Sequence, residues 1–352
     1  MRIKVFVVDS DTDYTTRLVN GFHRFLPDKV SLKVFSDIDS CYEELNVSSV
    51  NLLLVDRMQE FDVDRIPDNI ACGLLCEQKD IEEIGGINTI CKYQKIDTIY
   101  KMMLGIYAEK TTDIKFKTKT TNESIVMFTS VQGGSGVSTV AAAYALRKAS
   151  HGKKVFYLNL QKFGDSDFFF EDEGNSSFSD VLYTLKSKRS NLIIKLESAL
   201  KKDTSGVEYF STCKNAYDMF ELKDDEIITL VQALAQVKEY DEIIIDLSGT
   251  LDERMCLVMK QIADKIIYVS DGSPSGNIKF DRFCQVVKVL EQRDDDEILS
   301  KTSLLYNRFS SKTGEQLTEI PLNLVGGIRV FKGASGRRLI EAIAQTDDLD
   351  KI

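Results

Sequence analysis

Short apolar runs alternate with segments of helical periodicity along the first hundred residues. The apolar runs predict strands at 3–8, 32–35, 52–55, 71–75 and 89–91, and the periodic segments predict amphipathic helices at 13–25, 38–45 and 96–107. Strands that alternate with helices indicate a parallel sheet covered on both faces. Five such strands within the first 108 residues predict a flavodoxin-like α/β domain.

The pattern is interrupted after residue 108 and then resumes. Residues 109–124 are polar and rich in Lys and Thr, which predicts a linker, with an edge strand plus turn as the alternative. Further apolar runs predict strands at 125–131, 155–160, 242–247, 265–270 and 303–308, and an Ala-rich segment predicts a helix at 138–150. We therefore expect an N-terminal domain (1–108), a linker (109–124) and a second, doubly wound α/β domain (125–352).

The most informative stretch is the glycine-rich sequence TSVQGGSGVSTVAAA at 129–143, which joins a predicted strand to a predicted helix. The backbone N–H groups of such a turn converge on an anion, and the start of the helix adds partial positive charge. Glycine at 133, 134 and 136 lets phosphate approach the backbone closely. The residues expected to bind a nucleotide here are Gln132, Gly133, Gly134, Ser135, Gly136, Val137, Ser138 and Thr139.

Two hydroxyl groups of this loop have expected roles. Ser138 stands where a P-loop hydroxyl coordinates Mg²⁺, and Thr139 can hold the α-phosphate. The loop nevertheless departs from the ordinary pattern GxxxxGK[ST], since Val131 replaces the first glycine and Val137 replaces the lysine. A tight strand-to-helix turn without a ligand is therefore the alternative interpretation.

Downstream segments favour the nucleotide interpretation. The apolar strand in YDEIIIDLSG (240–249) has the form of a Walker B strand, in which Asp246 would bind Mg²⁺ through water. After the strand SLLYNR (303–308), Asn307 can hydrogen-bond an adenine edge, and Arg308 is assigned to the same site. The segment EIPLN (319–323), with Pro321, can line the base.

The order of these segments resembles the deviant Walker A ATPases of the MinD/ParA superfamily over residues 124–340. Members read KGGxGK[ST]T at the loop, whereas this chain reads QGGSGVST, so Gln132 and Val137 replace both lysines. The next strand of the family ends in Asp-x-Asp, and here Asn159 and Gln161 replace both carboxylates. The resemblance implies ATP and Mg²⁺ as cofactors and an ATP-sandwiched homodimer.

These departures together predict a nucleotide-binding protein with weak or no ATP hydrolysis. One charge-assisted hydrogen bond contributes about 1.5–3 kcal/mol to binding, a loss that abundant cellular ATP tolerates. Hydrolysis suffers more, because lysine and metal stabilise charge that develops in the transition state. We assign no catalytic residue.

Acidic and basic residues follow the strands of the first domain. Asp9 follows the first strand, Asp56 the third and Lys92 the fifth, a placement that resembles a response-regulator receiver domain with Asp56 as the possible phosphoacceptor. Ser10 occupies the position of the second acid, and Cys76 that of the hydroxyl residue. The alternative is a degenerate receiver used for docking or dimerisation.

A receiver-like domain followed by a degraded MinD/ParA ATPase resembles the TadZ/CpaE family of Tad (Flp, type IVb) pilus assembly, over nearly the whole chain. The segments NLQKFGDSD (159–167) and LDERMCLVMKQIADKIIYVSDGSPSG (251–276) support this resemblance. It implies a factor that marks a cell pole and recruits the pilus secretion machinery. The expected partners are a second copy, Tad secretion proteins or polar landmark proteins.

Charge and composition limit the alternatives. The chain has 45 Lys and Arg against 55 Asp and Glu, a net charge of -10, which argues against DNA and anionic membrane as partners. It therefore disfavours a ParA-like partitioning ATPase, and the acidic end IAQTDDLDKI disfavours a direct membrane anchor. The cysteines form no CxxC pair or zinc spacing, and we expect a cytoplasmic protein. A receiver-controlled signalling protein and a metabolic enzyme of the same superfamily remain alternatives.

Overall fold

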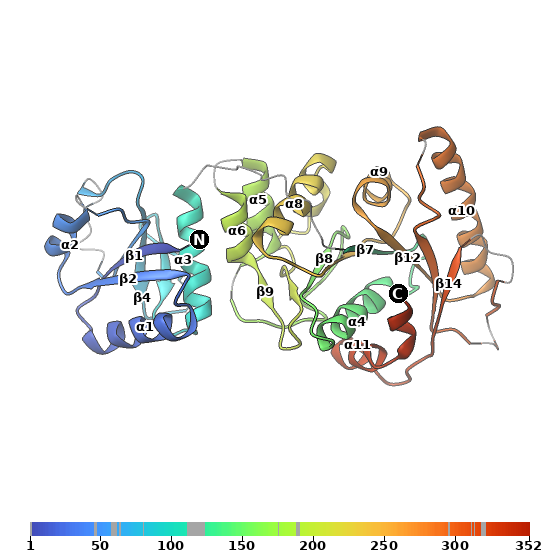
Figure 1. Ribbon diagram of the computed structural model, residues 1–352, viewed down its shortest axis with the longest axis horizontal. Helices are drawn as coiled ribbons and strands as arrows, with labels where there is room; N and C mark the ends of the chain where they lie inside the picture. Colours follow the sequence, from blue (N-terminus) through green and yellow to red (C-terminus); the bar gives the residue numbers. More distant parts are fainter. Residues whose placement is uncertain are drawn as a thin grey trace. The chain divides into compact units, whose positions relative to one another are not determined.

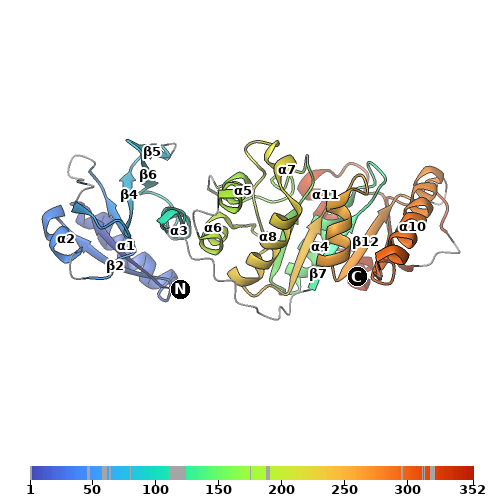
Figure 2. The same cartoon turned by 90° about the horizontal axis from the view of Figure 1, so that it is seen from above.

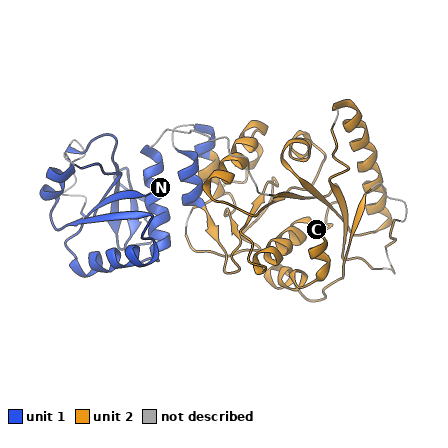
Figure 3. Ribbon diagram, in the orientation of Figure 1, with its two compact units in different colours: residues 1–116, 183–199 blue, residues 117–182, 200–352 orange. Residues whose placement is uncertain are grey.

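The structure, a computed structural model, divides the chain into two compact units. It describes residues 2–45, 48–57, 62, 65–79, 81–110, 124–174, 176–187, 191–294, 296–310, 312, 314–317 and 322–352. Unit 1 comprises residues 1–116 and 183–199, and unit 2 comprises residues 117–182 and 200–352 (Figure 3). Most of the predicted linker (111–123) and Pro321 lie outside the described residues.

Unit 1 contains a six-stranded sheet, blue to cyan in Figure 1. The strand order is β2-β1-β3-β4-β6-β5. Its strands are β1 (Ile3–Val8), β2 (Val30–Phe35), β3 (Leu52–Val55), β4 (Ala71–Cys76), β5 (Glu83–Ile84) and β6 (Ile87–Cys91). All neighbouring pairs are parallel except β5 with β6, which forms a short antiparallel hairpin. The predicted flavodoxin-like domain is confirmed.

Helices cover both faces of this sheet. They are α1 (Thr12–Phe25), α2 (Ile38–Leu45) and α3 (Ile96–Lys110), and one core cluster joins α1 and α3 to the sheet while a second joins α2. A later segment, α6 (Leu192–Ala199), also belongs to unit 1 and packs against α3. The carboxylate of Glu197 in α6 accepts hydrogen bonds from Lys29 Nζ at 2.8 Å and from Tyr100 OH at 3.3 Å.

Unit 2 contains an eight-stranded sheet in the order β14-β13-β12-β7-β11-β8-β10-β9. Its strands are β7 (Ser124–Thr129), β8 (Val155–Asn159), β9 (Lys201–Lys202), β10 (Glu208–Tyr209), β11 (Glu242–Asp246), β12 (Lys265–Ser270), β13 (Thr302–Asn307) and β14 (Asn323–Ile328). All neighbouring pairs are parallel except β9 with β10. The carboxyl ends of β7, β8, β11, β12 and β13 therefore meet at one edge, where ligands of such sheets bind.

Two layers of helices enclose the sheet of unit 2, which confirms the predicted doubly wound α/β fold. Helices α4 (Val137–Ser150) and α11 (Gly336–Ala344) pack side by side on one face, and α8 (Asp224–Val237), α9 (Glu253–Leu257) and α10 (Pro274–Asp294) cover the other (Figures 1 and 2). The remaining helices are α5 (Phe178–Ser187), α7 (Asp218–Glu221), the π-helical turn Val258–Ile262 and the 3₁₀ turn Asp347–Lys351. No helix among the described residues is long and apolar enough to cross a membrane.

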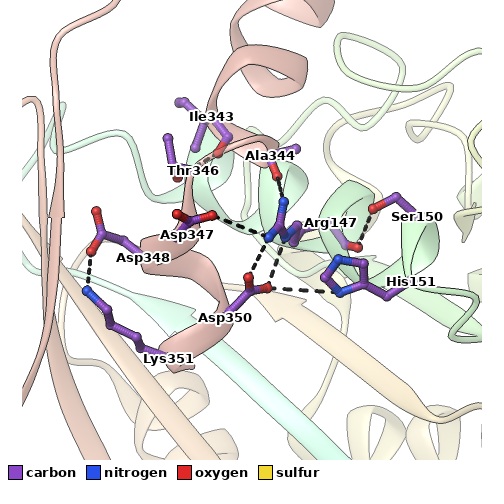
Figure 4. Close-up of polar contacts among 10 residues, drawn as sticks. All are labelled: Arg147, Ser150, His151, Ile343, Ala344, Thr346, Asp347, Asp348, Asp350 and Lys351. Atoms are coloured by element: carbon purple, nitrogen blue, oxygen red, sulfur yellow. Dashed lines mark hydrogen bonds and ion pairs between the residues drawn. The ribbon is translucent and has the colours of Figure 1, made fainter.

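The C-terminal turn is held on the helix that follows the glycine-rich loop. Arg147 of α4 forms a two-pronged ion pair with Asp350, with Nε 2.9 Å from Oδ1, and also donates to the carbonyl of Ala344 (Figure 4). His151 lies 3.9 Å from the same carboxylate. The hydrogen bond from Arg147 holds the pKa of Asp350 below its usual value. Leu349 is fully buried in the core cluster between α4, α11 and the sheet.

This packing makes the last turn part of the core of unit 2. Leu349→Ala is expected to lower the free energy of unfolding by about 2–5 kcal/mol, because it removes buried methyl groups and leaves a cavity. The control is Ile278→Ala in α10, where the side chain is 57% exposed and the expected change is within about 0.5 kcal/mol. Urea unfolding of both variants measures the difference, and equal midpoints would contradict the assignment.

Candidate nucleotide site and receiver site

The glycine-rich loop runs from the end of β7 to the start of α4. Gly134 has a φ of 74° and Gly136 a φ of 85°, the left-handed region that glycine adopts without steric cost. The loop therefore ends directly at the N-terminus of a 14-residue helix, where free N–H groups and the helix dipole favour an anion. Arg147 and Lys148 in the last turn of α4 complement the opposite end of this dipole.

Two residues from the end of β13 contact this loop. Asn307 is buried, and its Nδ2 donates to the carbonyl of Ser135 at 2.8 Å. Arg308 donates from its guanidinium to the carbonyl of Gly134. The structure thus brings both predicted residues to the loop, although it places them on loop carbonyls.

The two positions that carry lysine in the superfamily point elsewhere. Val137 is only 4% exposed and belongs to the core cluster beneath the loop. The side-chain oxygen of Gln132 lies 3.4 Å from Ser270 Oγ and from the backbone N of Asp271 at the end of β12. Both side chains therefore contact their own domain, one in the core and one at the neighbouring strand end.

Asp246 ends β11 and is completely buried. Its Oδ2 accepts a hydrogen bond from Tyr157 OH at 2.7 Å, and its Oδ1 accepts from Gln161 Nε2 at 2.6 Å. The same Gln161 nitrogen also donates to Ser138 Oγ at 2.7 Å. Burial raises the pKa of Asp246, and the hydrogen bonds from Tyr157, Ser138 and Gln161 partly oppose that shift.

The loop after β8 holds Gln161 in this position. The backbone N of Leu160 donates to the carbonyl of Asp246 at 3.0 Å, and that of Gln161 donates to Asn159 Oδ1 at 3.0 Å. The buried guanidinium of Arg254 lies 3.4 Å from the carbonyl of Leu160 and donates to two carbonyls near α7 at 2.8 Å. Sequence reasoning missed Arg254, because a lone arginine in a helix gives no signal of burial.

The geometry fits a polar ligand above the loop. Ser135 Oγ and Asn307 Oδ1 are buried, and neither has a hydrogen-bond partner among the described residues. A Cβ added at Gly133 or Gly134 would meet no atom within 4 Å, so the space above these residues is open. Buried polar atoms are normally satisfied, so a ligand with polar groups is a suitable partner for them.

The same surroundings do not fit Mg²⁺, which requires oxygen ligands with free lone pairs. The amide of Gln161 donates to both Ser138 and Asp246, the two predicted metal residues. No group of three or more His, Cys, Asp or Glu suited to a metal occurs among the described residues. Pro321, predicted to line the base, lies outside the described residues.

The predicted receiver residues meet at the ends of β1, β3 and β6. Lys92 Nζ lies 2.6 Å from Asp9 Oδ2, and both side chains are nearly inaccessible. Asp9 Oδ1 also accepts from the backbone N of Asp11, whose own carboxylate caps α1. Burial raises the pKa of Asp56, and the negative charge of Asp9 adds to the shift. The lysine therefore neutralises Asp9 within the acidic pair.

Cys76 and Ser10 stand at the positions where a receiver has a hydroxyl residue and a second acid, and each has a contact of its own. Cys76 Sγ lies 3.1 Å from the carbonyl of Gln78. Ser10 Oγ accepts from Arg57 Nη2 at 3.1 Å. Asp9, Asp56 and Lys92 thus lie together at the ends of their strands, and their role in phosphorylation remains a prediction.

The loop conformation can be tested with one methyl group. Gly136→Ala is expected to lower the melting temperature, because a Cβ at this positive φ costs about 1–2 kcal/mol. The new methyl would also lie 2.4 Å from Asn307 Nδ2. Thermal unfolding of the full chain measures the effect. Gly133→Ala is the matched control, since its Cβ meets nothing within 4 Å, and equal melting temperatures of the two variants would contradict the prediction.

Comparisons with known proteins identify relatives for the two parts of the chain separately. Residues 1–108 match the family model of the TadZ-like receiver domain. None of the curated proteins matches the chain. Its fold is similar to a ParA family ATPase from Chlorobium tepidum TLS, with a TM-score of 0.51 at 16% identity over 66% of this chain and 96% of that one.

A second solved structure supports the same fold. The MinC:MinD cell division protein complex of Aquifex aeolicus aligns with a TM-score of 0.50 at 17% identity, over 65% of this chain and 93% of that one. At this identity the likeness concerns the fold alone. The first 108 residues therefore belong to the TadZ-like receiver family, and the second part of the chain has the fold of MinD and ParA ATPases, as the resemblance to the TadZ/CpaE family predicted.

Proposed function

We propose that this chain is a nucleotide-binding localisation factor for Tad (type IVb, Flp) pilus assembly, which marks a cell pole and recruits the pilus secretion machinery. The observation that carries the proposal is the TadZ-like receiver domain at residues 1–108 in front of a MinD/ParA fold. The net charge of -10 disfavours the runner-up, a partitioning ATPase that moves DNA. The protein would act in the cytoplasm and reach the pole through its partners.

ATP is the ligand we propose for the glycine-rich loop. The N–H groups of residues 133–139 and the start of α4 would hold its phosphates, and Ser138 and Thr139 are half-buried beside them. The unpartnered oxygen of Asn307 can accept a hydrogen bond from the amino group of adenine. Arg308 brings one cation to the loop, where the superfamily has lysine.

Hydrolysis is proposed to be weak or absent. Val137 is packed in the core and Gln132 faces β12, so neither can stabilise charge on a transferring phosphoryl group. The positions of the two family carboxylates hold Asn159 and Gln161, which are neutral and cannot accept a proton from water. Bound ATP would therefore persist without being hydrolysed.

The receiver domain is proposed to serve as a docking module. Lys92 pairs with Asp9 and Cys76 replaces the hydroxyl residue, so the site lacks groups that a phosphoaspartate needs. Phosphorylation of Asp56, the basis of the signalling alternative, would have to break the buried pair of Lys92 with Asp9. The expected partners of this module are polar landmark proteins or Tad secretion proteins.

A long-lived homodimer is the assembly we propose for the ATP-bound state, by analogy with the superfamily. In the presence of ATP, we expect a dimeric mass in light scattering and phosphate release close to background, because hydrolysis cannot open the dimer. The Gly136→Ala protein, with a distorted loop, is the control for the nucleotide effect. A strict monomer in ATP, or brisk phosphate release, would count against this proposal.

The pilus function is tested in the organism that carries the gene. Deletion is expected to abolish Tad pili on the cell surface, and a fluorescent fusion that restores them should form a focus at a pole. Electron microscopy of surface pili and fluorescence imaging give the two readouts. Normal piliation in the deletion strain would refute the proposal, and a segregation defect instead would favour the partitioning ATPase.

A further inference from the structure

The centre of the candidate nucleotide site is occupied by a side-chain amide. Gln161 Nε2 lies 2.6 Å from Asp246 Oδ1 and 2.7 Å from Ser138 Oγ. An amide NH₂ group has two donor hydrogens, so it can satisfy both oxygens at once. The other oxygen of Asp246 already accepts from Tyr157 OH at 2.7 Å.

The amide is fixed in place by its own loop. The backbone N of Leu160, directly before Gln161, donates to the carbonyl of Asp246 at 3.0 Å. The backbone N of Gly164 donates to the carbonyl of Gln161 at 3.3 Å. Asn159 Oδ1 accepts from the backbone N of Gln161 at 3.0 Å. These bonds fix the backbone of Gln161, which places its side chain beside Ser138 and Asp246.

A divalent cation and this amide would both stabilise the buried carboxylate of Asp246. Asp246 is fully buried, and a buried carboxylate requires a cation or hydrogen-bond donors. Mg²⁺ would meet this need through oxygen ligands and bound water, and the amide meets it with N–H groups. The two occupants compete for the same oxygens of Ser138 and Asp246.

We infer that the Gln161 amide stands in for the divalent cation, so that this chain binds ATP equally well with and without Mg²⁺. The inference rests on the proposed nucleotide site and adds its metal requirement. The charge of the phosphates is then met by the loop N–H groups, the start of α4 and Arg308.

The test is the dissociation constant of ATP for the full chain, measured by calorimetry in excess Mg²⁺ and again in EDTA. We expect the two values for the unaltered protein to differ by less than about threefold. Gln161→Glu removes the two donors and sets a second carboxylate beside Asp246. In that variant, EDTA should weaken ATP binding by at least about tenfold relative to Mg²⁺, because a divalent cation must now separate the two carboxylates.

Asn159→Asp is the matched control, since it adds the same charge in the same turn. The side chain of Asn159 faces Gly164 and accepts a backbone hydrogen bond, a role that an aspartate keeps. This variant should retain metal-independent binding. Circular dichroism checks that both variants are folded, and the comparison on the unaltered protein stands without them.

The outcomes separate the inference from the proposed function. Tenfold or greater loss of ATP affinity of the unaltered protein in EDTA overturns the inference and leaves nucleotide binding intact. Absence of binding with and without Mg²⁺ overturns the proposed nucleotide function, and the inference with it. Equal binding under both conditions supports the inference.

Discussion

The buried carboxylate of Asp246 is the group on which the arrangement of the candidate site depends. It ends β11 between β7 and β8, where water cannot solvate it. Burying an unpaired carboxylate is very unfavourable, so the structure surrounds it with donors from two neighbouring segments. Tyr157 supplies a hydroxyl from within β8, and Gln161 supplies an amide from the loop after it. The loop that follows β8 is thereby tied to the loop that follows β7.

The receiver site meets the same constraint in another way. Asp9 directly follows β1 and its side chain is buried, and here the partner is the ammonium group of Lys92 at 2.6 Å. In each domain, then, a buried acidic residue at the carboxyl end of a parallel sheet is paired with a group of the chain itself, hydrogen-bond donors for Asp246 and a cation for Asp9. A cation that entered either site would have to displace this internal partner, which costs the hydrogen bonds already made. In both domains, therefore, the buried acid is satisfied by contacts within the chain and does not require a bound cation.

Much of the fold and part of the site could be predicted from the sequence. The apolar runs predicted most of the long strands, because parallel strands buried on both faces require continuous Val, Ile and Leu. They missed β14, where Gly326 and Gly327 interrupt the apolar run. The rule that such strands end at one edge also explains why the structure brings Ser138, Asp246 and Asn307 to the same edge of the sheet. By contrast, the burial of Val137 and the inward turn of Gln132 depend on side-chain packing from other elements, which periodicity does not report.

Other features depend on contacts between distant segments. The sequence analysis predicted no helix at α6 and gave no sign that this segment joins unit 1 through Ile194 and Glu197. The predicted domain boundaries at 108 and 124 stay predictions, since residues 111–123 lie outside the described part of the chain. The sequence showed that Gln161 replaces a carboxylate of the superfamily. That its amide donates to two oxygens could be seen only from the geometry of the turn.

Arg308 illustrates how the fold compensates for a changed loop. Among the described residues it is the one non-glycine residue with a positive φ, 56°, a conformation that costs about 1–2 kcal/mol. Asn307 directly before it is fixed by its bond to Ser135, and Phe309 directly after it donates its N–H to the carbonyl of Ile328 at 3.2 Å. The backbone between these two anchors turns sharply, and the turn directs the guanidinium to Gly134. The strain is thus the consequence of placing a cation on the loop from β13, at a site whose own helix begins with valine.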